Sequence, residues 1–112
     1  MENHRLNEYR NMWVVVFYDL PTITKKQNRN MNQFRKNLLK NGFVMVQLSL
    51  YMRHCASWES AEAHMKRVIQ FMPDEGSIIL LPITDRQFRM MKVFHNGNKT
   101  APPPPSVQLE LF

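Results

Sequence analysis

Cysteine and acidic side chains are the scarce components of this 112-residue chain. The lone Cys55 excludes an internal disulfide and suits a reducing compartment. No apolar run approaches the roughly 18 residues of a transmembrane helix, and residues 1–5 are too polar for a signal peptide. We therefore expect a soluble cytoplasmic protein that does not interact with membranes. At this length the chain can build one hydrophobic core but not two.

The charge balance points to the class of partner. The chain carries 15 Lys and Arg against 9 Asp and Glu, for a formal net charge of +6. Such an excess on one small domain favours a polyanion, which is usually a nucleic acid or an anionic membrane surface. Of these two we expect a nucleic acid.

The first predicted element is a strand over residues 12–19, in which WVVVFY at 13–18 is apolar or aromatic throughout. Such a run is typical of a strand that is covered on both faces. The Leu20-Pro21 step then forces the chain out of the strand. Asp19 is thereby expected at the lip of a central strand, partly desolvated and placed to hold a metal ion. The alternative is a turn-forming Asp before a proline.

A helix is predicted over residues 25–41, capped by Thr22 or Thr24 and ended at Asn41-Gly42. Its expected core stripe consists of Met31, Phe34, Leu38 and Leu39. Its basic residues, with no acidic residue among them, are Lys25, Lys26, Arg29, Arg35, Lys36 and Lys40. A solvated helix normally mixes charges and gains i,i+4 pairs, which this helix gives up. We interpret it either as a phosphate-facing helix or as a face that serves solubility alone.

The remaining pattern predicts two strands over residues 43–54, broken near 47–49, and a helix over 57–72 that Ser57 caps. The expected buried stripe of this helix is Trp58, Ala61, Met65, Val68, Ile69 and Met72. Residues 77–83 form a fourth strand, and Pro82 places it at a sheet edge because proline donates no ladder hydrogen bond. Thr84 and Gln87 have capping-box spacing and predict a short helix over 85–94.

The order β-α-β-β-α-β predicts an α+β, ferredoxin-like sandwich at residues 12–95. A polar segment at 1–11 precedes it, and a linker at 96–105 separates it from an extra C-terminal strand at 106–112. Two helices can cover only one face of the sheet, and soluble monomers avoid a large exposed apolar face. We therefore expect a face-to-face homodimer.

These motifs resemble the CRISPR-associated protein two family, which partners the Cas integrase in spacer acquisition. The resemblance lies in FYDLPT at 17–22, in FRK at 34–36 with GF at 42–43 and QLSLY at 47–51, and in ITDRQF at 83–88. The last segment is similar to variants from type II systems. Together these segments span about residues 12–95.

The resemblance implies a homodimer in which Asp19 of both subunits faces a shared cleft, binds Mg²⁺ and cleaves phosphodiesters. It also implies an adaptor that bridges integrase dimers and supports double-stranded DNA, and this role is the one we favour. The DNA backbone would be contacted by Lys25, Lys26, Arg29, Arg35, Lys36, Arg53, Arg86 and Arg89. A stand-alone ribonuclease of toxin type is the alternative, whereas an RNA-recognition module lacks its signature aromatics here.

The histidines and the cysteine show weaker evidence of a functional role. His54, His64 and His95 show no metal-ligand spacing and are interpreted as surface or packing histidines. Cys55 lies beside His54 without a third group and is a poor nucleophile candidate.

The tail at 106–112 alternates as a strand does and follows a polyproline spacer of about 12 Å at 102–105. We interpret it as a docking strand that adds to the edge beside Pro82 of the other subunit. Its docking residues would be Val107, Leu109, Leu111 and Phe112. A sliding-clamp-binding peptide at 108–112 and a structureless end are the alternatives.

Overall fold

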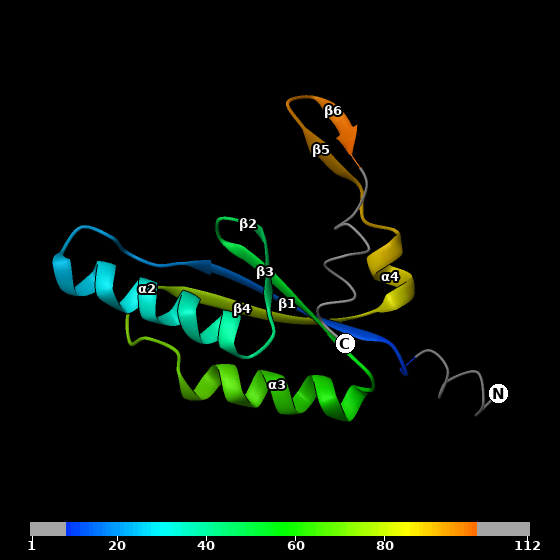
Figure 1. The fold of residues 1–112 in the computed structure, drawn as a ribbon, viewed down its shortest axis with the longest axis horizontal. Coiled ribbons are helices and arrows are strands. Elements are labelled where there is room, and N and C mark those ends of the chain that lie inside the picture. The colour runs from blue at the N-terminus through cyan, green and yellow to red at the C-terminus, as the bar shows by residue number, and fades with distance from the viewer. Residues whose placement is uncertain (1–8, 101–112) are drawn as a thin grey trace.

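The computed structural model describes residues 9–100 (Figure 1). The predicted docking strand at 106–112 and the four prolines at 102–105 lie outside the described residues, as does most of the polar segment at 1–11. Among the described residues, no helix is long and apolar enough to cross a membrane.

Strand β1 (Met12–Asp19) is central in a four-stranded antiparallel sheet of order β2-β3-β1-β4. It pairs with β3 (Leu50–Cys55) along one side and with β4 (Ser77–Thr84) along the other. Strand β2 (Val44–Gln47) forms one edge, and the predicted break near residues 47–49 is the turn that joins it to β3. The register of β2 against β3 also shifts just before this turn, between Met45 and Gln47. Strand β4 forms the other edge, as Pro82 predicts. The ferredoxin-like topology predicted from the sequence is confirmed.

Helices α2 (Lys25–Lys40) and α3 (Trp58–Gln70) lie on the same side of this sheet (Figure 1). Of the two candidate caps, Thr24 begins α2: its hydroxyl accepts from the backbone of Gln27, and the Gln27 side chain accepts from the backbone of Thr24. Ser57 caps α3 as predicted. These reciprocal contacts satisfy N–H groups that the first helical turn leaves without partners.

The main core lies between the sheet and these two helices. Alternate residues of a strand face opposite sides, so Met12, Val14, Val16 and Tyr18 point toward the helices. They meet Phe34 and Leu38 of α2 and Ala61 and Val68 of α3.

The predicted helix stripes were wrong at four positions, since Leu39, Trp58, Ile69 and Met72 are exposed. Leu39 lies about 100° around the helix from buried Leu38, which takes it off the core-facing side. On α3 the buried positions are Ala61, His64 and Val68, so a histidine occupies the stripe.

The opposite face of the sheet is partly covered, contrary to the expectation that it is left bare. Phe88 of α4 (Asp85–Arg89) stacks on Trp13 with ring centroids 3.9 Å apart and planes 8° apart. Val15 and Met52 are buried in the same small cluster. This third helix therefore closes the Trp13 end of the face.

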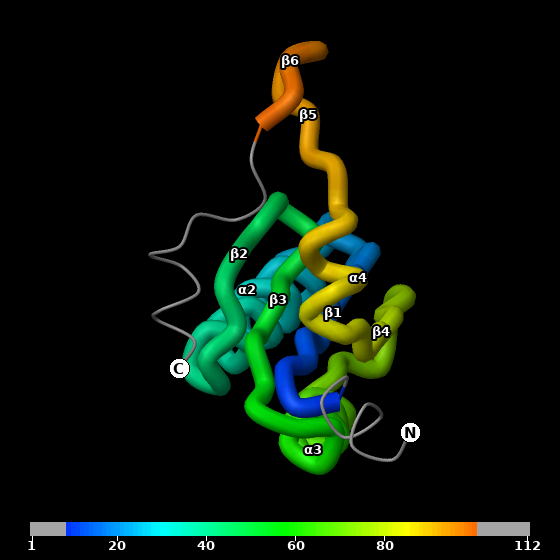
Figure 2. The backbone as a smooth tube through the Cα atoms, turned by 90° about the vertical axis from the view of Figure 1, so that its right-hand side faces the viewer, coloured from blue at the N-terminus to red at the C-terminus, as the bar shows by residue number. Residues whose placement is uncertain are grey.

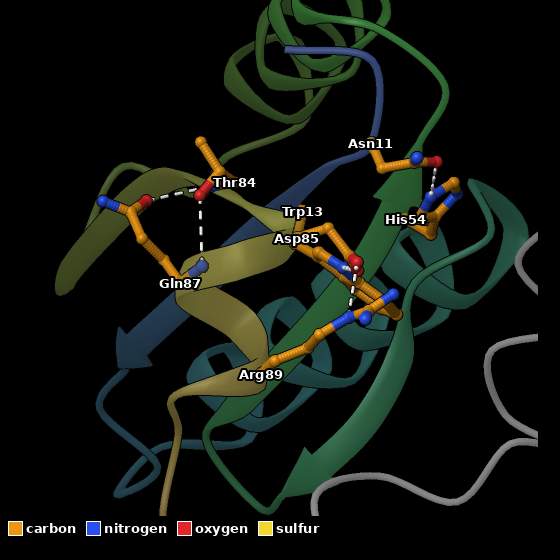
Figure 3. A network of polar contacts seen from close by, with 7 residues as sticks. All are labelled: Asn11, Trp13, His54, Thr84, Asp85, Gln87 and Arg89. Atoms are coloured by element: carbon orange, nitrogen blue, oxygen red, sulfur yellow. Dashed lines mark hydrogen bonds and ion pairs between the residues drawn. The ribbon is translucent and has the colours of Figure 1, made fainter. Parts of the chain in front are cut away.

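Polar contacts hold α4 in place (Figure 3). The indole Nε1 of Trp13 donates to Asp85 over 2.9 Å, and Arg89 Nε donates to the same carboxylate over 2.8 Å. The predicted capping box between Thr84 and Gln87 is present. The helix ends at Arg89, earlier than the expected residue 94.

A short hairpin follows, formed by β5 (Val93–His95) and β6 (Asn98–Thr100). Asn96 and Gly97 both have positive φ, 51° and 80°, as a tight hairpin turn of type I′ requires. The hairpin projects away from the four-stranded sheet beyond α4 (Figures 1 and 2). It spans the boundary near residue 96 at which the sequence interpretation begins a linker.

Candidate functional site: the Asp19 end of β1 and the basic face of α2

Asp19 is the last residue of β1 and pairs with Ser77 at the start of β4. The chain then leaves the sheet through Leu20 and Pro21, as predicted. The side chain of Asp19 is exposed, so the expected partial desolvation was wrong for a single protomer.

Asp19 lies in an open hollow of about 320 Å³ at this end of the sheet. Its other polar lining residues are Gln47, Ser49 and Ser77, and its apolar side includes Phe17, Leu50 and Ile79. The hollow therefore offers one carboxylate, neutral oxygen atoms and an apolar wall.

Tyr18 fixes the turn that borders this hollow. Its hydroxyl donates to the carbonyl of Leu48 over 2.9 Å, and its backbone N–H donates to Ser49 over 3.0 Å. Burial raises the pKa of Tyr18 to about 12, with a further contribution from Tyr51. The hydroxyl therefore keeps its proton at neutral pH and remains a donor.

Two other acidic residues have structural partners. Glu75, just before β4, accepts from Gln27 over 2.8 Å, whereas Asp85, at the opposite end of β1, is held by Trp13 and Arg89. Within residues 9–100 no three His, Cys, Asp or Glu side chains gather as metal ligands. The donors fit Mg²⁺, which one or two carboxylates can hold while water and phosphate oxygens complete its shell. One protomer supplies one of these carboxylates.

The basic residues of α2 form a stripe on its outer face. At 100° per residue, Lys25, Arg29, Lys36 and Lys40 fall within about 60° of one another and opposite the buried positions Phe34 and Leu38. We call these four residues the α2 stripe. In the described part of the chain, none of them takes part in an ion pair. Lys26 lies beside the stripe, whereas Arg35 lies to the other side, where its charge acts on Tyr18.

The remaining predicted DNA contacts lie elsewhere. The guanidinium of Arg53 packs against Gly42 and donates to the carbonyl of His54 over 2.8 Å. Arg86 and Arg89 are exposed on α4, across the sheet from α2. One protomer therefore brings together the cations of α2 but not those of β3 and α4.

His54, His64 and Cys55 behave as packing residues, whereas His95 is exposed. Burial lowers the pKa of His54, whose Nε2 lies 3.1 Å from the Asn11 amide oxygen (Figure 3). Burial, together with the charges of Arg53 and Arg67, lowers the pKa of His64 to about 4. Burial raises the pKa of Cys55, so its thiolate, the form that attacks as a nucleophile, is disfavoured.

An apolar surface adjoins Asp19 on the face of the sheet away from α2 and α3. Phe17, Ile79 and Leu81 are 37%, 57% and 44% exposed, and Phe17 and Ile79 are direct cross-strand partners. We call these three residues the bare face. The all-apolar first strand predicts such a face. Ile79 and Leu81 were not predicted to belong to it, although their alternate positions along residues 77–83 indicate that they share one face of the strand.

Comparison with known proteins identifies the family. The family model described as CRISPR associated protein Cas2 matches residues 12–91. The chain belongs to the Cas2 family. The resemblance found in the sequence is thereby confirmed.

Two curated relatives show how far the similarity to the Cas2 family extends. A protein of Flavobacterium psychrophilum is 49% identical over 108 residues, which cover 96% of this chain and 94% of the relative. One of Parvibaculum lavamentivorans is 48% identical over 102 residues, which cover 90% of this chain and all of the relative. Both are named CRISPR-associated endoribonuclease Cas2.

A solved structure described as a crystal structure of cas2 supports the fold. It superposes with a TM-score of 0.55 at 18% identity, over 84% of this chain and 95% of the other. At that identity the match supports the ferredoxin-like architecture and not a shared activity.

Proposed function

We propose that this Cas2-family chain is a subunit of CRISPR spacer acquisition: a cytoplasmic homodimer that binds the backbone of double-stranded DNA and bridges integrase dimers. The α2 stripe is the observation that carries the proposal. A helix face with several cations and no acidic neighbour forgoes i,i+4 pairs, and phosphates would provide the missing partners. Such contacts follow the spacing of the DNA backbone and read no base sequence.

The bare face supports the homodimer. Phe17, Ile79 and Leu81 are large, partly exposed apolar side chains on one face of two paired strands, and a second copy would remove them from water. In a two-fold interface each residue contributes twice. Because Asp19 lines the same hollow as Phe17 and Ile79, this interface would also bring two carboxylates toward each other.

The free edge of β4 supports the proposed docking strand. The outer side of β4 pairs with no strand among residues 9–100, and Pro82 lies within it. We retain the proposal that a strand from the other subunit adds to this edge.

A second function, Mg²⁺-dependent phosphodiester cleavage, is supported by the position of Asp19 and by the names of the relatives. Asp19 of each subunit would hold the divalent ion, which would polarise phosphate oxygens and acidify a bound water. Asp19 would supply the anionic ligand, and Ser49 and Ser77 neutral oxygens beside it. The turn carrying Ser49 is held in place by the hydrogen bond from Tyr18 to Leu48.

The adaptor and the stand-alone ribonuclease of toxin type differ in their need for a partner. We expect full-site integration of a short duplex in a reconstituted mixture with the integrase subunit. Replacing the α2 stripe with glutamine should abolish integration, and Asp19→Asn should preserve it. Integration that survives loss of the stripe, or that needs Asp19 in a folded DNA-binding dimer, would contradict the adaptor proposal.

A further inference from the structure

Two exposed aromatic side chains meet at the end of β1 opposite Asp19. Tyr9 precedes β1 and Trp58 is the first residue of α3, and their rings pack edge to face with centroids 6.0 Å apart. Tyr9 is 46% exposed and Trp58 is 37% exposed. A tryptophan is usually well buried, so an exposed tryptophan beside a second aromatic ring indicates a surface for a ligand.

Two hollows, of about 470 and 450 Å³, share these rings. Arg10 and Glu59 border the first, and Pro82, Arg86 and Met90 border the second. Their lining residues belong to the start of β1, the start of α3, the end of β4 and α4. These segments lie at the end of the molecule opposite the start of α2 (Figure 1). We call this region the aromatic groove: Tyr9, Arg10, Trp58, Pro82, Arg86 and Met90.

The polar groups of the groove differ in whether their hydrogen-bonding and ion-pairing capacity is already used. The hydroxyls of Ser57 and Thr84 are already used as helix caps, and the Gln87 amide completes the second capping box. Arg10 and Arg86 are exposed and form no ion pair with any residue from 9 to 100. Among residues 9–100, the groups available to a ligand are therefore two aromatic rings and two guanidinium groups, with Glu59 as the opposing charge.

We propose that the aromatic groove binds single-stranded nucleic acid, with a base stacked on Trp58 or Tyr9 and flanking phosphates at Arg10 and Arg86. Proteins that bind single strands combine aromatic stacking surfaces with cations in this way. Each hollow has a volume within the range of about 300–1,000 Å³ that is common for small-ligand pockets. The inference rests on the proposed nucleic-acid function and adds a site for its single-stranded portions.

The groove and the α2 stripe offer different chemistry. The stripe presents cations alone, which suits the backbone of a duplex. The groove presents rings, which need an unpaired base to stack on. Because β1 rises about 3.3 Å per residue, its two ends lie some 23 Å apart. A single strand bound in the groove would therefore need several more nucleotides to reach Asp19.

The two tryptophans provide a direct probe. Trp13 is buried and stacked on Phe88, whereas Trp58 is exposed, so acrylamide quenching of the full-length chain should report mainly on Trp58. We expect ten-nucleotide deoxythymidine and uridine oligomers to shield Trp58 from acrylamide. Shielding by only one of them would identify the strand as DNA or RNA.

Trp58→Ala should weaken binding of these oligomers by about 5- to 100-fold, the usual effect of removing one stacked base contact. The matched control is Met72→Ala, which truncates a side chain of similar exposure just beyond the other end of α3 and should leave binding unchanged. Affinity for a blunt duplex should be the same in both variants, since it depends on α2.

Unchanged oligomer affinity in Trp58→Ala would overturn the proposal, as would shielding of Trp58 by a synthetic peptide of residues 106–112 but not by the oligomers. Failure of the proposed function is distinguishable: the chain would then bind no duplex, while its Trp58-dependent binding of single strands would persist.

Discussion

Replacing Ile79 with lysine is expected to dissociate the proposed homodimer. Ile79 is 57% exposed beside Phe17 on the bare face. Full burial of such a side chain stabilises by about 1.5–3 kcal/mol, so covering the exposed part is worth about 0.9–1.7 kcal/mol per copy. A two-fold interface contains Ile79 twice, for a total of about 2–3.5 kcal/mol.

At about 1.4 kcal/mol per factor of ten, loss of this burial raises the dimer dissociation constant by about 30- to 300-fold. Lysine adds the cost of bringing two ammonium groups near the two-fold axis, so these values are a lower limit. Sedimentation velocity across a micromolar concentration series measures the change.

The matched control is Ile69→Lys. Ile69 is 54% exposed, but it lies on α3, on the other side of the sheet. This variant should sediment like the unmodified chain. A dimer of unchanged affinity in Ile79→Lys would refute the assignment of the interface, and a monomeric unmodified chain at micromolar concentration would refute the dimer itself.

Three further predictions concern single side chains. Asp19→Asn should abolish any Mg²⁺-dependent cleavage of RNA or DNA while duplex affinity, measured by fluorescence anisotropy, stays within about twofold, because the carboxylate lies away from the α2 stripe; residual cleavage at the unmodified rate would exclude Asp19 as a ligand. Phe88→Ala should cost about 3–5 kcal/mol in urea unfolding, because it removes the ring stacked on Trp13 and leaves a cavity; a cost below about 1 kcal/mol would show that α4 contributes little to the fold. The lowered pKa of His64, about 4 against about 6.5 in an unfolded chain, makes the folded state bind protons more weakly. Stability from this group is therefore complete above pH 6.5 and is lost as the pH falls toward 4, and urea unfolding of His64→Gln should show a smaller loss over that window.

Local signals predicted the sheet and its helices well. The apolar run ending at Asp19, the caps Thr24 and Ser57, and Pro82 each act through the backbone of a few neighbouring residues. Such features depend little on tertiary contacts, so the sequence alone reveals them.

The errors came from features that tertiary packing decides. Trp58 falls on the helical period of the core, but at the first turn of α3 it extends beyond the sheet and meets Tyr9 instead. His64 is buried without a sequence signal, since histidine is common in both environments. The β5–β6 hairpin is an error of another kind, because Asn96-Gly97 is a strong local turn signal that was overlooked.

The candidate site was predictable only in part. Asp19 and the cations of α2 could be named from the sequence, because one ends a strand and the others share a helix without acidic residues. The arrangement of these groups in a complete site could not be predicted, since a second carboxylate near Asp19 would come from another protomer. The separation of Arg86 and Arg89 from α2 follows from α4 packing on Trp13, a contact between residues distant in sequence.

The salt dependence of duplex binding tests the central claim most directly. The measurement compares the unmodified chain with a variant in which four cations of α2 are replaced by glutamine: Lys25, Lys26, Arg29 and Lys36. A control with the same net charge replaces four exposed cations elsewhere: Lys66, Arg67, Lys92 and Lys99.

Each phosphate contact contributes about 0.9 to the slope of log affinity against log salt concentration. We predict that the α2 variant loses about 3 to 4 from this slope per bound protomer and that the control keeps nearly the full slope. Equal slopes in the α2 variant and the unmodified chain, or an equal loss in both variants, would contradict the assignment of DNA binding to α2.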